Sequence, residues 1–143
     1  RLIFAPRLSR HEDHLARYAC ADLFLDTFSY TAHVTALDAF WAGLPVLTCA
    51  GDQMAKRAGA SVALAMGFPE LVAADPLDYE ACAVFLATHP EALRNLRQRV
   101  AAARASAPLF RVEERVRQLE RAYETMWERH CRGEAPVSFF VSD

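Results

Sequence analysis

The stretch of sequence that decides the fold is residues 23–49, which read LFLDTFSYTAHVTALDAFWAGLPVLTC. A short apolar run, 23–25, is followed by a polar loop and then by apolar side chains at helical spacing. Gly43 and Pro45 come next, which is the usual signal for the end of a helix. A second apolar run covers 46–49. The order strand, loop, helix, strand predicts parallel strands joined by right-handed crossovers.

The same alternation continues outside this stretch. Residues 2–5 form an apolar run that ends at Pro6, as a buried parallel strand would, and residues 71–73 are a possible further strand. The helices that the sequence predicts cover 11–19, 34–42, 53–66, 76–88, 90–105 and 112–132. The predicted fold class is therefore α/β: a Rossmann-like parallel sheet flanked by helices, with a helical C-terminus.

Composition narrows the class of protein. The chain has 143 residues, 53% of them hydrophobic and 24% charged, which fits one packed domain. With 16 basic and 18 acidic side chains, we expect no nucleic-acid partner. No apolar run approaches the roughly 18–20 residues that span a bilayer, so no membrane partner is expected either. The cysteines are widely spaced and suit free thiols in a cytoplasmic protein.

The loop that follows residues 23–25 is the predicted binding site. In open α/β sheets ligands bind beyond the carboxyl ends of the strands, and a helix beginning there favours an anion through its free N–H groups and its dipole. His33 and Thr35 add possible donors, and the Asp38 carboxylate could bind ribose hydroxyls. These features predict a nucleotide site. The alternative is that Thr31 or His33 only caps the helix and that Asp38 is solvated.

Two histidines, His11 and His14, lie in the helix that follows the first apolar run. They could ligate a metal, but no third ligand stands at a clear spacing, so we predict no metal. The sequence contains no Gly-x-Gly-x-x-Gly, Walker, Gly-x-Ser-x-Gly or His-Glu-x-x-His motif. Nicotinamide dehydrogenases, P-loop kinases and serine hydrolases are thereby disfavoured.

Taken together, these residues resemble the O-linked N-acetylglucosamine transferases, and most closely their bacterial SPINDLY-like members. The matching segments are 1–6, 23–27, 32–38, 41–48, Gly51, Arg57, 60–61, 108–110, Tyr123 and 126–128. The resemblance implies that residues 1–143 are a single, partial domain, the nucleotide-sugar-binding C-terminal lobe of a glycosyltransferase B fold. Members of the family transfer a sugar from a UDP-sugar to Ser or Thr hydroxyls of an acceptor protein, with inversion and without a metal or other cofactor.

The resemblance also assigns roles by position, with UDP-GlcNAc as the expected donor. The residues expected to bind it are His11, His14, His33, Val34, Thr35 and Asp38. His33 and Thr35 would face the diphosphate and Asp38 the ribose. His14 would lie beside the uracil, whose edge the backbone of 8–10 would read.

This sequence departs from the family pattern at three places. Val34 stands where the usual His-Thr-Thr has a threonine, which leaves only its backbone N–H as a donor. His11 replaces a lysine in a loop that is one residue longer than usual, and Thr31 replaces an asparagine. The family's other lobe, with its acceptor groove and catalytic histidine, precedes this region. We therefore expect this chain alone to be inactive, with its catalytic residues unknown.

Another class of function stays open: a degenerate Rossmann-like module that binds no nucleotide and serves protein–protein contact, which Val34 favours slightly. A receiver-like signalling domain is disfavoured, because no acids cluster after residues 2–5. We further expect the helix that begins at His33 to open to solvent. We also expect the chain to self-associate, or to be covered by further residues of a longer polypeptide, because its last helix carries an apolar stripe. That stripe consists of Leu119, Tyr123, Met126 and Trp127.

Overall fold

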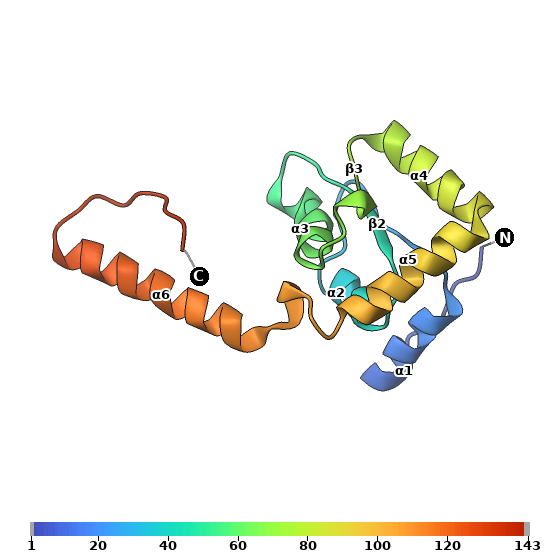
Figure 1. Cartoon of the computed structure of the whole chain (residues 1–143), viewed down its shortest axis with the longest axis horizontal. Coiled ribbons are helices and arrows are strands. Elements are labelled where there is room, and N and C mark those ends of the chain that lie inside the picture. The colour runs from blue at the N-terminus through green and yellow to red at the C-terminus, as the bar shows by residue number, and fades with distance from the viewer. Residues whose placement is uncertain (1, 142–143) are drawn as a thin grey trace. The chain divides into compact units, whose positions relative to one another are not determined.

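The computed structural model of the chain describes residues 2–141, which form two compact units (Figure 1). One unit extends to Leu109 and the other begins at Phe110. The first contains the sheet and every predicted site residue, and the second contains the long C-terminal helix. The assignment of residues 1–143 to one domain stays a prediction.

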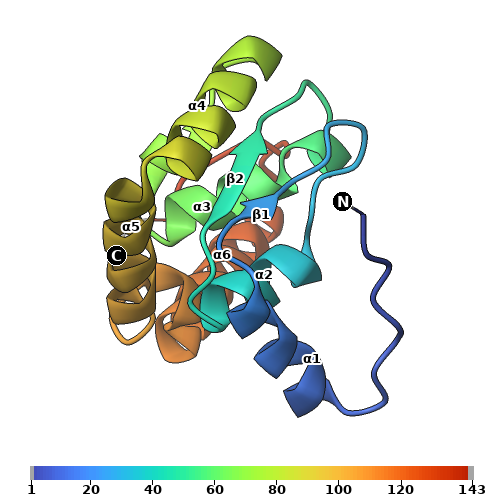
Figure 2. The same ribbon diagram turned by 90° about the vertical axis from the view of Figure 1, so that its right-hand side faces the viewer.

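The sheet of the first unit consists of parallel strands in the order β1-β2-β3. Their bounds are Phe24–Leu25 for β1, Val46–Cys49 for β2 and Val72–Ala73 for β3. Figure 2 shows β1 beside β2. All four residues of the central strand β2 are buried, which explains why they read as a continuous apolar run. The predicted parallel α/β sheet is confirmed.

Helices lie on both faces of this sheet. Their bounds are His11–Arg17 for α1, Val34–Trp41 for α2, Ala58–Ala65 for α3, Pro76–Thr88 for α4 and Pro90–Ala103 for α5. In Figure 1, α3 and α4 lie on opposite sides of β2 and β3, and both helices contact β2. Leu47 and Cys49 of β2 pack with Tyr79 of α4. Thr48 points the other way, towards α3, as alternation along a strand requires.

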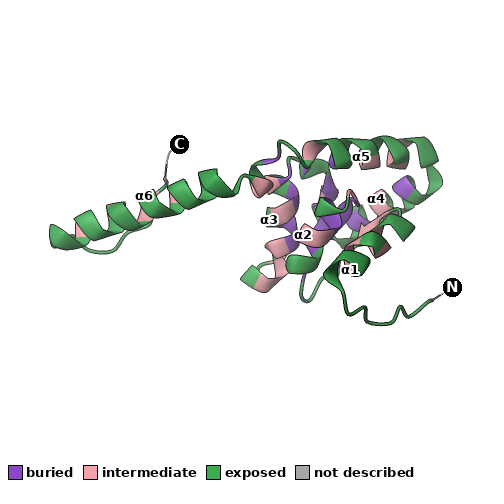
Figure 3. Ribbon diagram, turned by 90° about the horizontal axis from the view of Figure 1, so that it is seen from below, coloured by how far each residue is buried: buried purple, intermediate pink, exposed green. Residues whose placement is uncertain are grey.

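Short 3-10 turns and one further helix complete the described chain. The turns cover Tyr18–Cys20, Met54–Lys56, Pro69–Leu71 and Pro108–Phe110, and the helix α6 covers Val112–Cys131. The core of the first unit lies between the sheet and its helices, where Figure 3 shows the buried residues in purple. Phe40 of α2 and Leu71 are among its fully buried side chains. In the second unit, α6 has no buried residue.

Two predicted elements are wrong in the structure. Residues 2–5 form no strand; they are exposed and pair with no other strand of residues 2–141, so the hydrogen bonds that make a strand are absent there. Arg1, which belongs to the segment 1–6 that resembles the family, lies outside the described residues. The helix predicted over 53–66 begins only at Ala58, after the turn Met54–Lys56.

The late start of α3 has a specific cause in the loop that precedes α2. In a continuous helix the N–H of Gly59 would donate to the carbonyl of Ala55. Here the Thr31 hydroxyl donates to that carbonyl oxygen at 3.0 Å and accepts from the Gly59 N–H at 3.2 Å. The backbone N–H of Thr31 also donates to Ala55, at 2.9 Å. Thr31 thus takes the place of the helical hydrogen bond and joins the loop to α3.

Candidate functional site

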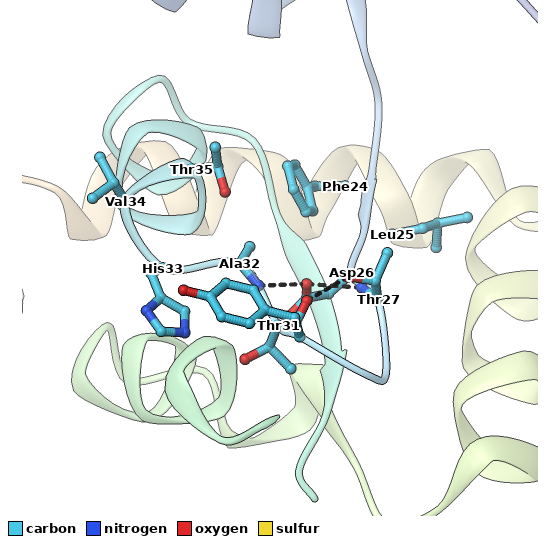
Figure 4. A pocket seen from close by; sticks show the side chains of 10 residues that line it. Phe24, Leu25, Asp26, Thr27, Thr31, Ala32, His33, Val34 and Thr35 are labelled. Atoms are coloured by element: carbon cyan, nitrogen blue, oxygen red, sulfur yellow. Dashed lines mark hydrogen bonds between the residues drawn. The ribbon is translucent and has the colours of Figure 1, made fainter. Parts of the chain in front are cut away.

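An open pocket of about 410 Å³ lies at the carboxyl end of β1 (Figure 4). Its lining comes from three consecutive parts of the chain: the end of β1, the loop that follows it and the first residues of α2. The lining residues are Phe24, Leu25, Asp26, Thr27, Tyr30, Thr31, Ala32, His33, Val34 and Thr35. This is the place at which open α/β sheets bind their ligands.

The buried carboxylate of Asp26 holds the loop of the pocket in shape. Its Oδ1 accepts hydrogen bonds from the backbone N–H groups of Thr27 at 2.8 Å and Ala32 at 2.7 Å. Its Oδ2 accepts from the hydroxyl of Thr48 at 2.8 Å. The residue is only 5% exposed. These bonds satisfy both oxygens, which a buried carboxylate requires, and they fix the two ends of the loop to β2.

The first turn of α2 opens towards the pocket, as predicted. His33 is the N-cap residue and makes no side-chain capping hydrogen bond. Thr31, the other candidate cap, is occupied by its bonds to the α3 segment. Val34 is 66% exposed and Thr35 is exposed. The interpretation that the side chain of Thr31 or His33 caps the helix is therefore wrong, and the positive end of the helix dipole faces accessible space.

A second group of polar side chains gathers between α1 and α2. Nε2 of His11 and Nε2 of His14 each lie 3.9 Å from an oxygen of Asp38. The Tyr18 hydroxyl lies 3.3 Å from Nε2 of His14 and donates to the backbone oxygen of Thr35 at 3.4 Å. Because the Asp38 side chain is only 17% exposed and faces two histidines, its interpretation as a solvated helix residue is wrong.

The pKa of Tyr18 reflects this setting. Partial burial raises it, the Asp38 carboxylate raises it further, and Arg17 acts in the opposite direction. The hydroxyl is therefore held in its neutral form, in which it can donate a hydrogen bond. Tyr18 was not among the site residues predicted from the sequence.

A second open pocket, of about 490 Å³, has both histidines in its lining. It is lined by residues 5–11, His14 and Arg17. The Arg17 guanidinium donates to the backbone oxygen of Pro6 and so ties this segment to α1. The backbone of 8–10, expected to read the edge of a base, therefore lies in the same pocket as His14.

All six predicted site residues thus lie at one end of the first unit, around the start of α2. His33, Val34 and Thr35 line the first pocket, and His11 and His14 line the second. The carboxylate of Asp38, a residue of α2, faces the two histidines. Within residues 2–141 no group of three or more His, Cys, Asp or Glu side chains is arranged to hold a metal ion.

Sequence reasoning missed two residues that support the loop of the first pocket, Asp26 and Thr48. A signal for each was present: an acid directly after an apolar strand, and a hydroxyl inside another. Each is costly in a core unless it has a partner, and here each is the partner of the other.

A parallel α/β sheet flanked by helices, with an open pocket at the carboxyl end of a strand and an open helix N-terminus beside it, defines a Rossmann-like domain. The family description that matches the sequence is more specific: it is glycosyl transferase family 41, over residues 1–119. This chain belongs to that family.

Individual relatives agree with this assignment. The chain is 38% identical over 130 residues to the probable UDP-N-acetylglucosamine–peptide N-acetylglucosaminyltransferase SEC of Arabidopsis thaliana, which covers 90% of this chain and 13% of that protein. The corresponding enzyme of Caenorhabditis elegans is 35% identical over 133 residues, 93% of this chain and 12% of that protein. A solved structure of a variant Thermobaculum terrenum O-GlcNAc transferase superimposes with a TM-score of 0.81 and 34% identity, covering 92% of this chain and 24% of that one.

The chain thus spans a small part of the length of these relatives. Within the described residues, no helix is both long and apolar enough to cross a membrane.

Proposed function

We propose that this chain is the donor-binding part of a protein O-GlcNAc transferase, and that it binds UDP-GlcNAc. A complete enzyme would transfer the sugar to Ser or Thr hydroxyls of an acceptor protein. The names of the relatives support this donor and this acceptor, and the family assignment supports the reaction class. The free cysteines of the described chain suit a cytoplasmic enzyme.

The observation that carries the proposal is the open pocket at the start of α2. The diphosphate would lie there against the backbone N–H groups of Val34 and Thr35, the Thr35 hydroxyl and the His33 ring. The missing threonine hydroxyl at Val34 costs one hydrogen bond but leaves the backbone donor in place. An uncapped helix N-terminus of this kind binds anions through both hydrogen bonds and the helix dipole.

The neighbouring polar group would hold the nucleoside. The Asp38 carboxylate would accept hydrogen bonds from the ribose hydroxyls, and His14 would lie beside the uracil, with His11 at its rim. In the chain as it stands, the histidines face the carboxylate at 3.9 Å, a separation at which a ribose hydroxyl can join the two groups.

These residues would also favour the departure of UDP. Negative charge develops on the diphosphate as the glycosidic bond breaks, and donors fixed in advance at that place stabilise it. We propose an inverting transfer that needs no metal and no other cofactor, in which the donors of α2 supply part of this stabilisation. The remaining charge and the acceptor hydroxyl require groups that this chain does not provide, so the chain alone would be inactive.

Titration of the ¹⁵N-labelled chain with UDP, followed by NMR, tests the proposal. The expected result is saturable shifts of the backbone amides of 30–38 and of the α1 histidines, with UDP-GlcNAc acting at the same amides. UMP, which lacks the second phosphate, should bind more weakly. Glu80→Ala, on the exposed surface of α4, serves as the control and should bind as the wild type does. No shifts at millimolar UDP would instead favour the module without nucleotide binding.

A further inference from the structure

The side chains of Tyr30 and His33 form a stacked pair in the first pocket. Their ring centroids lie 4.7 Å apart and their planes differ by 12°. Tyr30 is 62% exposed, and both residues line the pocket. Stacking of this kind restricts the second torsion of the histidine side chain, because rotation of the ring would break the parallel contact.

The backbone around Tyr30 is fixed on both sides. The Thr27 hydroxyl donates to the carbonyl oxygen of Tyr30 at 2.6 Å. The next residue, Thr31, is fixed by its two hydrogen bonds to the carbonyl of Ala55, one from its N–H and one from its hydroxyl. Although exposed, the Tyr30 ring therefore stands on a well-held part of the loop and can act as a fixed support for His33.

One nitrogen of the His33 ring is buried under this arrangement. Nε2 is buried and has no hydrogen-bond partner within residues 2–141. Proteins leave a buried acceptor without a partner more readily than a buried N–H donor. A neutral imidazole carries one proton, on either Nδ1 or Nε2. The lower cost is for Nε2 to be the bare nitrogen, which places the proton on Nδ1.

We propose that Tyr30 is a positioning residue: by stacking on His33 it keeps Nε2 buried, so that Nδ1 carries the proton and is the atom presented to a ligand. A ring with a fixed N–H donor suits an anion. The ligand it would serve is the diphosphate of the donor, so this part of the inference rests on the proposed function. The orientation of the ring does not depend on that function and can be measured without ligand.

The first experiment reads the tautomer of His33 in the ligand-free chain, by long-range ¹H–¹⁵N correlation NMR at neutral pH, with His33→Gln to assign the signal. The wild type should show a protonated Nδ1 and a bare Nε2. Tyr30→Phe keeps the ring and should leave this pattern unchanged. Tyr30→Ala should give a mixture of both tautomers. Phe28→Ala is the matched control, because Phe28 is an exposed aromatic of the same loop that packs edge-to-face against Tyr79 and not against His33.

The second experiment measures UDP affinity in the same variants. Tyr30→Ala should weaken UDP binding about two- to tenfold, the range expected for one aromatic contact, and Tyr30→Phe should bind as the wild type does. An unchanged His33 tautomer in Tyr30→Ala would overturn the proposal, as would an equal tautomer change in Tyr30→Phe. A wild type with the expected tautomer that does not bind UDP would refute the proposed function and leave the positioning role standing.

Discussion

Gly59 leaves the space that the Asp26 carboxylate occupies. A Cβ atom at position 59 would come within 2.3 Å of Oδ2 of Asp26 and 2.9 Å of the Thr48 hydroxyl, both inside van der Waals contact. Gly59→Ala should therefore lower the free energy of unfolding by about 1–3 kcal/mol, the usual cost of overpacking, measured by urea denaturation. Ser61→Ala, an exposed change in the same helix, is the control. Equal stability of Gly59→Ala and the wild type would contradict the tight packing around Asp26.

Thr35 and Asp38 carry separable parts of nucleotide binding. Thr35→Ala should lower UDP affinity by on the order of 1 kcal/mol through a lost hydrogen bond. Asp38→Ala should reduce the preference for UDP over its 2′-deoxy analogue, because the carboxylate faces the ribose in our proposal. Calorimetric titration of both variants with both ligands measures these effects. Wild-type affinities throughout would contradict the roles assigned to Thr35 and Asp38.

Tyr79 links the stability of the fold to alkaline pH. Its hydroxyl donates to the backbone oxygen of Asp26 at 2.9 Å. Burial raises the pKa of Tyr79, and Asp26 and Cys49 act in the same direction. A raised pKa means that the folded state holds the proton more tightly than the unfolded state. The resulting stability is complete below the unfolded pKa of about 10 and is lost as the pH rises through the folded pKa.

The free energy of unfolding should therefore fall above about pH 10, as measured by denaturation at several pH values. Tyr79→Phe should be less stable near neutral pH, because a hydrogen bond is lost, but should show a shallower alkaline decline. Ser61→Ala, an exposed change that removes no tyrosine, should keep the wild-type slope. An identical slope in Tyr79→Phe would show that Tyr79 does not link stability to pH.

At the level of single residues, the sequence reveals groups that must face a ligand more easily than those that support them. His33, Thr35 and Asp38 could be singled out because they follow a strand and begin a helix, an order visible over a few neighbouring positions. The role of Thr31 could not be predicted, because its partners, Ala55 and Gly59, are 24 and 28 residues away. The residues that face a ligand can be recognised from their neighbours in the sequence, whereas the residues that hold them in place are known only from the fold.

At the level of elements, Gly43 ends α2 in a conformation that other residues avoid. Its φ is 81°, in the left-handed region. Gly43→Ala should lower the free energy of unfolding by about 1–2 kcal/mol, and Gly43→Asn by less, since asparagine tolerates this region. An added Cβ would lie 3.4 Å from that of Ala101, an ordinary contact, so the cost comes from the backbone. Thermal denaturation measures the order of the three proteins; equal stability of the alanine and asparagine variants would contradict it.

Helix ends that carry local signals could be predicted well. α4 begins at Pro76 as expected, because the Asp75 carboxylate accepts from the N–H groups of Leu77 and Asp78 at 2.8 and 2.9 Å. No local signal of this kind shows whether the apolar run 2–5 forms a strand. An apolar run predicts burial, but a strand also requires a partner to pair with, and pairing is decided by the rest of the fold.

At the level of the whole molecule, the parallel order of the strands brings α1 beside the start of α2. His14 and Asp38 are 24 positions apart in sequence, yet their side chains lie 3.9 Å apart. The resemblance to the transferase family placed both at the nucleoside, whereas spacing alone gave no reason to pair them. The packing of α1 and Tyr18 against the first turns of α2 supplies that reason.

The second unit presents a helix face suited to a helical partner. The apolar residues of α6 recur at alternating spacings of four and three, the pattern of a coiled-coil seam. They are Val112, Val116, Leu119, Tyr123 and Met126, and their exposed fractions lie between 46% and 64%. We expect the chain to self-associate through this face in solution, because apolar side chains in a continuous stripe gain stability when they are removed from water.

Light scattering over a range of protein concentrations checks this expectation. The wild type should exceed the monomer mass of 16.0 kDa, and the excess should grow with concentration. Leu119→Glu places a charge in the middle of the stripe and should return the mass to that of the monomer, because burial of an unpaired carboxylate is costly. Arg117→Glu changes charge on the opposite side of the same helix and should associate as the wild type does. A wild type at the monomer mass at every concentration, or equal dissociation of both variants, would mean that this face does not mediate association.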